Sequence, residues 1–391
     1  MRELIIKNEL MKFIEEHEDW RVLLSSDPYN LIIKEDEGFP NVYLFKYNML
    51  ESDMYQKISQ EARGLIIEVS EVSGQRVTKM LAHSFDKFFN YTEPQGEMVL
   101  EKFNWNDYSF QEKRDGSLMR LWFYKDRWVV SSSGTIDAHK AGIQIPSVGY
   151  NSFGDMFDAI FKKYDVDLDS LDKGITYSFE MTSPDNKIVV DYIDDELTLI
   201  GMRVNKLNME VDPVVFNPFK DIKTAERFEF TSLQNALDVI NGRTNFEGLV
   251  LVDSAFNRVK IKTEEYLALA KMSDMASSDR GILRMILAGT IDDVANRLPH
   301  LQPRIDIVKG FVESEISNIK QLISSVDFTQ DRKTIALSIK DSPYSRFVFQ
   351  LISNPNQDVI GSYFVSDNLE KIYKSYKEKF NIGEETEEEV I

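Results

Sequence analysis

The residues best suited to covalent chemistry lie in the segment 111–118, which reads Gln-Glu-Lys-Arg-Asp-Gly-Ser-Leu. A lysine is a good nitrogen nucleophile only when neutral, and desolvation or nearby cations favour that form. Lys113 is therefore a candidate nucleophile. Gly116 would let the backbone approach a phosphate or nucleotide closely, since glycine has no side chain. Taken alone, Asp-Gly-Ser is also an ordinary turn signal.

A pair of lysines occurs in the segment 259–263, Val-Lys-Ile-Lys-Thr. Strand alternation places Lys260 and Lys262 on one face and the two apolar residues on the other. Two cations on one strand face could clamp a phosphate, stabilise the charge that develops in phosphoryl transfer, and lower the pKa of a nearby lysine. The alternative is an edge strand whose lysine face is solvated, which protects against aggregation.

Two glutamates begin or lie on predicted strands. Glu180 lies in the strand 175–181, on the face opposite its aromatic residues, and Glu247 precedes Gly248 and an apolar run. Each glutamate alone is compatible with an exposed strand residue. Together with Asp115, the two carboxylates would hold Mg²⁺ through its water shell and through substrate phosphate oxygens, as this ion prefers.

Composition excludes several other chemistries. The chain has no cysteine, which rules out disulfides, thiolate zinc sites and cysteine nucleophiles and suits a reducing cytoplasm. Its four histidines have no metal-ligand spacing. No apolar run is long enough to span a membrane. The net charge of −19 is not typical of a nucleic-acid binder, although net charge describes solubility better than it describes one local site.

The predicted elements divide the chain into three parts. A helix is predicted over residues 3–18, short strands dominate residues 40–262, and helices interrupt them at 153–164 and 232–240. Helical periodicity prevails later, with apolar residues three and four apart in 305–323. We predict an α+β domain at 1–265, a helical domain at 266–382, and an acidic disordered tail at 383–391.

Four elements follow one another in a single β-rich region. They are Lys113-x-Asp115-Gly116, the strand glutamate Glu180, Glu247-Gly248 and Lys260-x-Lys262. This order resembles the covalent nucleotidyltransferase superfamily of ATP-dependent DNA ligases, RNA ligases and GTP-dependent mRNA capping enzymes. That superfamily works through a lysyl-nucleotide intermediate and has an ATP-grasp-like ligase domain of antiparallel sheets with flanking helices.

Three further matches narrow the resemblance to the RNA ligase 1 family of T-even-phage type. They are Arg63 within Glu-Ala-Arg-Gly, the segment 85–90 (Phe-Asp-Lys-Phe-Phe-Asn), and Tyr266 just after the lysine pair. The resemblance covers about residues 40–266. That family has a helical C-terminal domain, whereas DNA ligases and capping enzymes have an OB barrel there, and no train of strands follows residue 263.

The resemblance implies a role for each matched residue. Lys113 attacks the α-phosphate of ATP, Lys260 and Lys262 contact that phosphate, and Arg63 and Lys87 hold the β- and γ-phosphates. The nucleotide-binding set is completed by Phe89, Gly116, Glu180 and Tyr266. The metal set for Mg²⁺ (or Mn²⁺) is Asp115, Glu180, Glu247 and, from the helical domain, Asp292. For Arg63 and Lys87, a surface turn residue and a lysine that snorkels beside core aromatics are the alternatives.

One position departs from the family pattern. The family has a lysine before a glycine in the strand after the nucleophile, where this chain has Ser133 before Gly134. A serine hydroxyl could replace a hydrogen bond of that lysine but not its charge.

The resemblance also implies substrates and partners. We expect a monomeric, cytoplasmic ATP-dependent RNA ligase, in the host cytoplasm if phage-encoded, that joins 5′-phosphate and 3′-hydroxyl RNA ends such as those of nicked tRNA. The alternatives are a DNA ligase, a capping guanylyltransferase, a catalytically silent nucleotide- or RNA-binding relative, and a structural protein. A pure binder or structural protein would not need the nucleophile.

Overall fold

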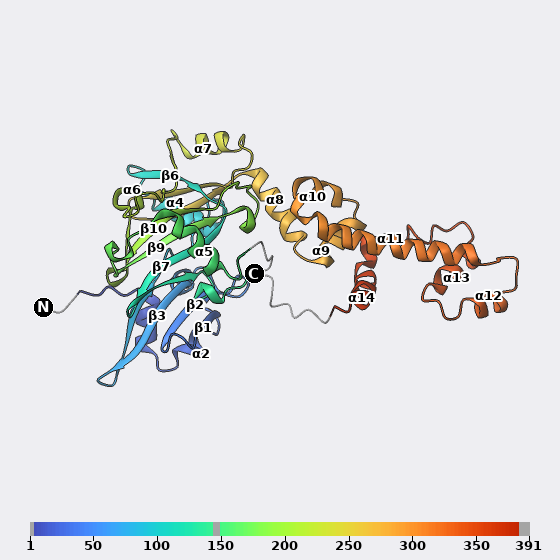
Figure 1. Cartoon of the computed structure of the whole chain (residues 1–391), viewed down its shortest axis with the longest axis horizontal. Helices are drawn as coiled ribbons and strands as arrows, with labels where there is room; N and C mark the ends of the chain where they lie inside the picture. The colour runs from blue at the N-terminus through green and yellow to red at the C-terminus, as the bar shows by residue number, and fades with distance from the viewer. Residues whose placement is uncertain (1–3, 144–148, 383–391) are drawn as a thin grey trace. The chain divides into compact units, whose positions relative to one another are not determined.

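The chain divides into two compact units, and the boundary falls between Tyr266 and Leu267 (Figure 1). The computed structural model describes residues 4–143 and 149–382, so the predicted acidic tail lies outside the described residues. The first unit contains three sheets with flanking helices, and the described part of the second contains helices and no strands. The predicted α+β fold with a helical C-terminal region is confirmed.

Three sheets form the first unit, and all strand pairs are antiparallel except the one between β14 and β5. The first sheet has the order β1 (Leu31–Glu35), β2 (Val42–Tyr47), β3 (Arg63–Val72), β4 (Gln75–Ala82). The second has the order β11 (Met209–Val211), β10 (Glu196–Val204), β9 (Ile175–Thr182), β7 (Ser117–Tyr124), β8 (Arg127–Ser132). The third has the order β12 (Arg227–Phe228), β6 (Tyr108–Lys113), β13 (Gly248–Asp253), β14 (Arg258–Lys262), β5 (Phe89–Asn90).

The helices of the first unit are short and cover the sheets. They are α1 (Glu9–Glu16), α2 (Trp20–Leu24), α3 (Lys57–Glu61), α4 (Pro94–Glu101), α5 (Phe153–Phe161), α6 (Pro213–Phe216), α7 (Leu233–Ile240) and α8 (Glu264–Met275), which continues past the boundary. The helix predicted over 3–18 is shorter than expected. It begins after Asn8, whose side chain accepts a hydrogen bond from Met11 N, because this cap satisfies a free backbone donor at that point.

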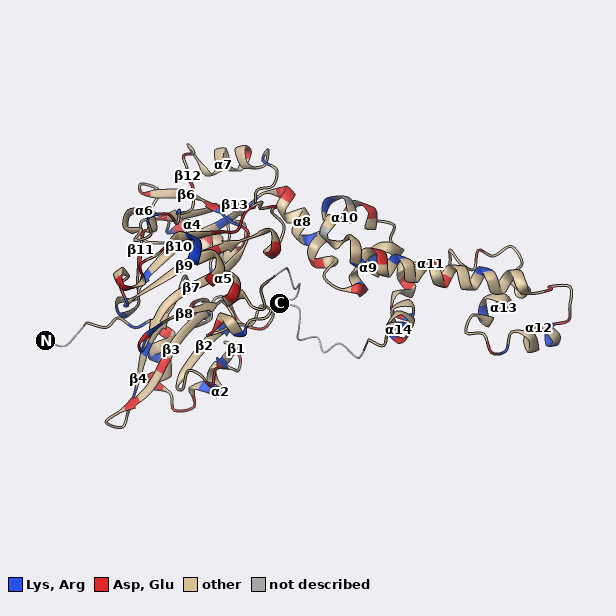
Figure 2. Ribbon diagram, in the orientation of Figure 1, with Lys and Arg blue, Asp and Glu red and all other residues tan. Residues whose placement is uncertain are grey.

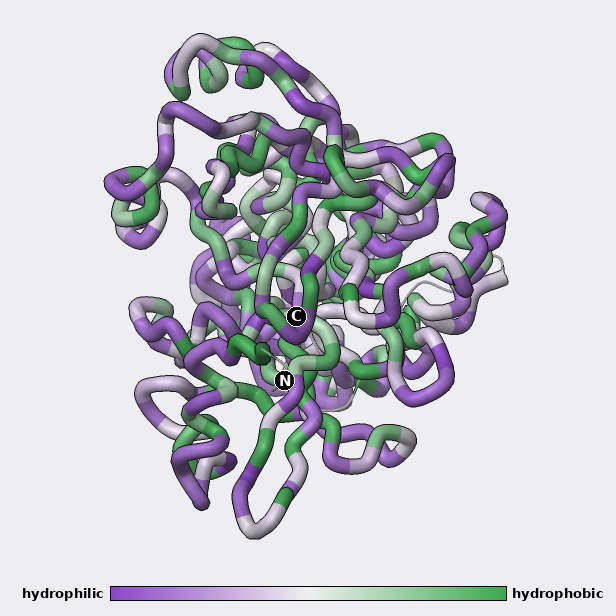
Figure 3. Tube along the Cα trace, turned by 90° about the vertical axis from the view of Figure 1, so that its left-hand side faces the viewer, coloured by the Kyte–Doolittle hydropathy of each residue, from purple (hydrophilic) through white to green (hydrophobic). Residues whose placement is uncertain are grey.

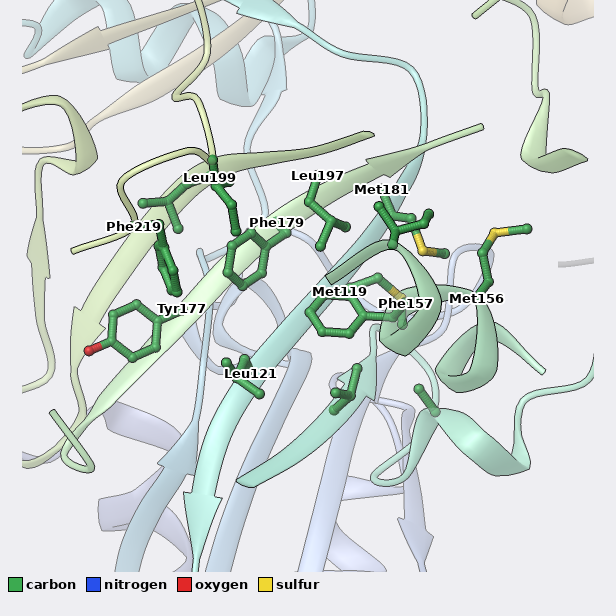
Figure 4. Packing of buried hydrophobic residues seen from close by; sticks show 14 of the residues in the cluster. Met119, Leu121, Met156, Phe157, Tyr177, Phe179, Met181, Leu197, Leu199 and Phe219 are labelled. Atoms are coloured by element: carbon green, nitrogen blue, oxygen red, sulfur yellow. The ribbon is translucent and has the colours of Figure 1, made fainter. Parts of the chain in front are cut away.

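Burial on both faces explains how the first two sheets pack. Strands β2, β7 and β9 each have four consecutive buried residues, as expected for strands covered on both sides. Hydrophobic stretches, green in Figure 3, are interspersed with hydrophilic ones, purple, along the trace. The first and second sheets share a core in which Leu44 and Ile66 pack in one cluster with Trp122 and Val129. The opposite face of the second sheet packs on α5, where Phe157, Phe179, Leu197 and their neighbours point toward one another (Figure 4).

The third sheet buries one face and presents the other to the site. Val259 and Ile261 of β14 are fully buried with Leu249, Leu251 and Ile240. Because side chains alternate along a strand, Lys260 and Lys262 are directed to the opposite face, as predicted. Strand β14 is not an edge strand, since β13 pairs with one side of it and β5 with the other.

The second unit is a helical assembly with its own core. Its helices are α9 (Asp279–Leu287), α10 (Ile291–Arg297), α11 (Gln302–Ser325), α12 (Arg332–Ser338), α13 (Ser345–Ser353) and α14 (Leu369–Phe380). Apolar residues of α9, α11 and α14 form one cluster, which includes Leu283, Val308 and Tyr376. The apolar spacing in 305–323 therefore marks a buried helix face, as predicted.

Candidate active site

Lys113 is the last residue of β6, and its ammonium contacts a buried carboxylate. Its Nζ lies 2.7 Å from Oε1 of Glu247, and Nζ of Lys262 lies 3.2 Å from the same oxygen. Glu247 is 2% exposed, whereas both lysines are 22% exposed by side chain, so a ligand can reach the lysines but not displace the acid easily. The other oxygen of Glu247, Oε2, is buried without a hydrogen-bond partner.

Gly248 explains why this glutamate is held at the start of β13. Its φ is +150°, and a Cβ there would lie 1.9 Å from the carbonyl oxygen of Ile261 on the neighbouring strand. Only glycine fits so close an approach between backbones. The Glu-Gly pair in the sequence therefore fixes Glu247 opposite the ends of β6 and β14, where Lys113 and Lys262 lie.

Lys260 has a strongly perturbed ammonium group. Burial, together with the neighbouring cations, lowers its pKa to about 7. Those cations are Arg63, Lys113, Lys87 and Lys262. The solvated lysine face that the sequence left open is therefore wrong for Lys260. We call Lys113, Lys260 and Lys262 the lysine cluster.

Glu180 lies beside the lysine cluster on β9. Burial and the nearby Glu247 raise the pKa of its carboxyl group to about 7, although Lys113 and Arg63 act in the opposite direction. Its Oε1 accepts a hydrogen bond of 3.1 Å from the backbone N–H of Gly116. Glu180 therefore changes charge near neutral pH, next to the candidate nucleophile.

Arg63 and Lys87 are cations without a carboxylate in ion-pair contact in the described parts of the chain. The guanidinium of Arg63 lies 4.9 Å from the ring centroid of Phe88, and one of its terminal nitrogens is buried without a partner. The Nζ of Lys87 lies 3.3 Å from the hydroxyl of Tyr47 and 5.8 Å from the ring centroid of Phe89. Aromatic faces hold both cations while leaving their charges available to an anion.

Asp115 has a different environment from the one expected of a metal ligand. Its Oδ2 accepts hydrogen bonds of 2.8 Å from the backbone N–H groups of Val189 and Val190, and its Oδ1 accepts one of 2.8 Å from the hydroxyl of Tyr266. The side chain is buried. Both oxygens are thus occupied by protein donors, so Asp115 anchors the turn after Lys113 to a distant segment.

Tyr266 and Gly116 also make packing contacts within the protein. The ring of Tyr266 lies 4.6 Å from Nζ of Lys262, and burial raises the pKa of its hydroxyl. At Gly116 a Cβ would lie 2.3 Å from the carbonyl oxygen of Met181, so packing against β9 requires glycine there. The sequence had suggested close approach to a nucleotide as the reason for this glycine.

Several contributors to the site escaped prediction. Tyr47 and Phe88 lie under the cations of Lys87 and Arg63, and the hydroxyl of Tyr192 accepts a hydrogen bond of 2.9 Å from the backbone N–H of Asp115. These contacts join residues that are far apart in the sequence, so spacing carried no signal for them.

Two other predicted positions have surroundings of their own. Ser133 is exposed in the turn after β8, where the buried guanidinium of Arg120 donates to the carbonyls of Gly64 and Ser132. Asp292 belongs to the second unit and is 80% exposed, with its Oδ1 2.7 Å from Nζ of Lys309. The structure gives Asp292 a local partner within its own unit.

The acidic residues were tested for their fit to a divalent metal. Among the described residues, no three acidic or histidine side chains are close enough to enclose an ion directly. The unpartnered Oε2 of Glu247 and the carboxyl of Glu180 suit contact with the water shell of an ion that arrives with phosphate. Asp115 does not fit this role, because its oxygens are already occupied.

Comparison with known families identifies the family to which this chain belongs. A family model described as RNA ligase, of the T4 RNA ligase 1 type, matches residues 61–266. The match covers more than half of the chain and includes the lysine cluster, Arg63, Lys87, Glu180 and Glu247. The chain belongs to the RNA ligase family. The predicted resemblance is thereby confirmed.

Two curated relatives of the chain are viral proteins. A protein of Autographa californica nuclear polyhedrosis virus, named as a bifunctional polynucleotide kinase/RNA ligase, is 26% identical over 312 residues. That match covers 75% of this chain but only 43% of the viral protein. The RNA ligase of Rhodothermus phage RM378 is 25% identical, and the match covers 86% of this chain and 88% of the phage protein.

Solved structures resemble the chain more distantly. An archaeal ATP-dependent RNA ligase has a TM-score of 0.43 and 13% identity, with 78% of this chain and 79% of that chain covered. A Naegleria gruberi RNA ligase variant with ATP and Mn has a TM-score of 0.34 and 9% identity, with 61% and 95% covered. Within the described stretches of this chain, no helix is both long and apolar enough to cross a membrane.

Proposed function

We propose that this RNA ligase uses ATP to join a 5′-phosphate RNA end to a 3′-hydroxyl RNA end, with Lys113 as the nucleophile. The observation that supports this most is the lysine cluster itself: Lys113 and Lys262 share the buried carboxylate of Glu247, and further cations lie close enough to lower the pKa of Lys260. Such a surplus of positive charge in a partly buried place is costly unless an anion binds there. A nucleoside triphosphate supplies that anion.

In the first step, Nζ of Lys113 attacks the α-phosphorus of ATP. The ammonium first loses a proton, for which the contacting Glu247 carboxylate is the nearest acceptor. A P–N bond forms and the bond to the pyrophosphate oxygen breaks, so that pyrophosphate leaves with the bonding electrons. Lys260 and Lys262 stabilise the charge on the α-phosphate, and Arg63 and Lys87 bind the departing phosphates.

In the second step, a 5′-phosphate oxygen of RNA attacks the same phosphorus and releases Lys113, which takes up a proton. In the third, a 3′-hydroxyl attacks the RNA phosphate and AMP leaves. A divalent ion bound with ATP would neutralise phosphate charge, and Glu180 and Glu247 would contact its water shell. Asp292 remains our proposal for a further metal contact from the second unit.

The natural substrate and setting belong to the same proposal. Phage and viral relatives named as RNA ligases support a role in RNA repair in a host cytoplasm, with nicked tRNA as the expected substrate. We assign the bond chemistry to residues 1–265 and the choice of RNA to the helical residues 266–382, and we expect a monomer.

Incubation with α-labelled ATP or GTP and Mg²⁺, followed by denaturing electrophoresis, tests the central assignment. We expect labelled AMP to remain on the wild-type chain, to be lost in acid as a phosphoramidate is, and to be absent from Lys113→Ala. Labelling of that variant at the wild-type rate contradicts Lys113 as the nucleophile. Stronger labelling by GTP favours a capping enzyme, and sealing of DNA ends in preference to RNA favours a DNA ligase.

A further inference from the structure

A second polar space opens beside the lysine cluster in the first unit. It is a cavity of about 470 Å³ between α3, α4 and the turn that joins β13 to β14. We call it the side cavity, and its lining includes Tyr55, Lys57, Lys87, Lys102, Phe256 and Arg258. Lys87 connects it with the lysine cluster, because the same ammonium lowers the pKa of Lys260.

The lining combines cations with accessible aromatic rings, beside the carboxyl groups of Glu61, Asp86 and Glu210. Lys102 is exposed at the end of α4, and Tyr55 is 60% exposed. Lys57 and Arg258 are held in place by Asp86 at 2.5 Å and by Glu210 at 2.6 Å. In a chain of net charge −19, cations interleaved with aromatic rings are suited to single-stranded nucleic acid, since phosphates bind the cations and bases stack on the rings.

The position of Phe256 supports a binding role. Its φ is +61°, a conformation that a bulky side chain rarely adopts and that costs free energy. The carboxylate of Asp253 maintains this turn by accepting hydrogen bonds from the backbone N–H groups of Ala255 and Asn257 at 3.0 and 2.9 Å. The turn therefore presents the Phe256 ring in the lining of the side cavity at a cost in backbone strain.

The order of the chemical steps determines where the RNA must enter. Phosphoryl transfers proceed with the attacking and leaving atoms roughly in line. Lys113 attacks from one side and pyrophosphate leaves from the other, toward Arg63 and Lys87. When Lys113 itself becomes the leaving group, the attacking 5′-phosphate must arrive from the side that pyrophosphate vacated. That side is where Lys87 borders the side cavity.

We propose that the side cavity binds the first nucleotides of the RNA strand that carries the 5′-phosphate. The inference rests on the proposed function. The 5′-phosphate replaces pyrophosphate at Arg63 and Lys87, and the following phosphates contact Lys57, Lys102 and Arg258 while a base stacks on Phe256. An oxygen of the 5′-phosphate forms the new P–O bond as the P–N bond to Lys113 breaks and the lysine recovers a proton.

The test uses the full-length chain, first adenylylated and then freed of ATP and pyrophosphate. A short, labelled, 5′-phosphorylated RNA is added, and AMP transfer is followed in a single turnover at fixed salt. The variants are Lys102→Glu and Phe256→Ala, and the control is Lys79→Glu, an exposed lysine on β4. Loss of one stacked base or one phosphate contact should lower the transfer rate at low RNA concentration by about five-fold or more.

The expected result is slower AMP transfer in both variants relative to their own rate of adenylylation, with Lys79→Glu equal to wild type. Equal transfer by all four proteins would overturn the side cavity as the binding site while leaving the ligase function intact. Normal AMP transfer combined with slow sealing, measured after a 3′-hydroxyl strand is added and dependent on its concentration, would also overturn it, by assigning the cavity to the other strand. If wild type forms no adduct, both proposals fail.

Discussion

Two groups of lysines in this chain have very different surroundings. Lys260 on β14 is buried among other cations, and that environment lowers its pKa to about 7. Lys371 and Lys374 on α14 are exposed, and Lys374 is 77% exposed with Glu378 4.0 Å away. In Figure 2 the basic residues of the helical unit are interspersed with acidic ones.

The difference shows what makes a charge useful for chemistry. A lysine exposed on a helix is screened by water and by neighbouring acids, so its electrostatic effect is small. A lysine held in a partly buried cluster keeps its field, because little water remains to screen it. The same contrast separates the buried Asp115 from the exposed Asp292.

The strongest test of this contrast is loss of the lysine pair. Lys260→Ala or Lys262→Ala should slow formation of the lysyl-AMP adduct by roughly a hundred- to a thousand-fold, because each removes a cation from the α-phosphate. Lys374→Ala is the matched control and should change the rate less than two-fold, on the order of a surface charge effect. The measurement is the initial rate of α-labelled ATP incorporation. If the rate of adduct formation changes by less than about three-fold in both β14 variants, the two lysines belong only to a solvated strand face.

The buried acid should matter for stability. Asp115→Ala leaves the N–H groups of Val189 and Val190 and the Tyr266 hydroxyl without their acceptor, which should lower the free energy of unfolding by about 3–5 kcal/mol. Asp292→Ala breaks only an exposed pair with Lys309 and should change it by less than about 0.5 kcal/mol. Urea unfolding of the three proteins measures both values. Equal effects would remove the distinction between the two aspartates.

The contrast between buried and exposed charges also predicts how stability depends on pH, through the buried carboxyl group of Glu180. Its folded pKa, about 7, is raised above the usual 4.5, so its contribution to stability is full below pH 4.5 and is lost as pH rises through about 7. The free energy of unfolding of the wild type should fall by roughly 1–3 kcal/mol between pH 4.5 and 7.5, and Glu180→Gln should not show this fall. Glu378→Gln, on the exposed face of α14, should leave the pH profile unchanged. Parallel profiles for wild type and Glu180→Gln would contradict the raised pKa.

The smallest effect is expected from the helical unit. Reversing two exposed charges, Lys371→Glu with Lys374→Glu, should lower the ratio of sealing rates on a nicked stem-loop and on a linear RNA by about two- to ten-fold at fixed salt, if α14 contacts phosphates. Adduct formation in the same protein provides the control. An unchanged ratio would leave α14 a structural helix, with specificity residing elsewhere in the unit.

The sequence alone was sufficient to predict several helices and strands and the order of the site residues along the chain. Periodicity correctly assigned the helices near 153–164 and 232–240 and the alternating face of β14, because these patterns depend only on local geometry. The order of Lys113, Glu180, Glu247 and Lys260 along the chain indicated the family through its resemblance to the family's motifs. It also predicted that residues after 263 are helical.

Only the tertiary structure decided how those residues are used. Contacts between strands far apart in sequence make Glu247 a shared partner of Lys113 and Lys262, direct both oxygens of Asp115 to protein donors, and fill the space beside Gly116 with the backbone of β9. Burial then sets the pKa values of Lys260 and Glu180. Desolvation and long-range pairing depend on which segments pack together, and no local pattern of residues specifies that.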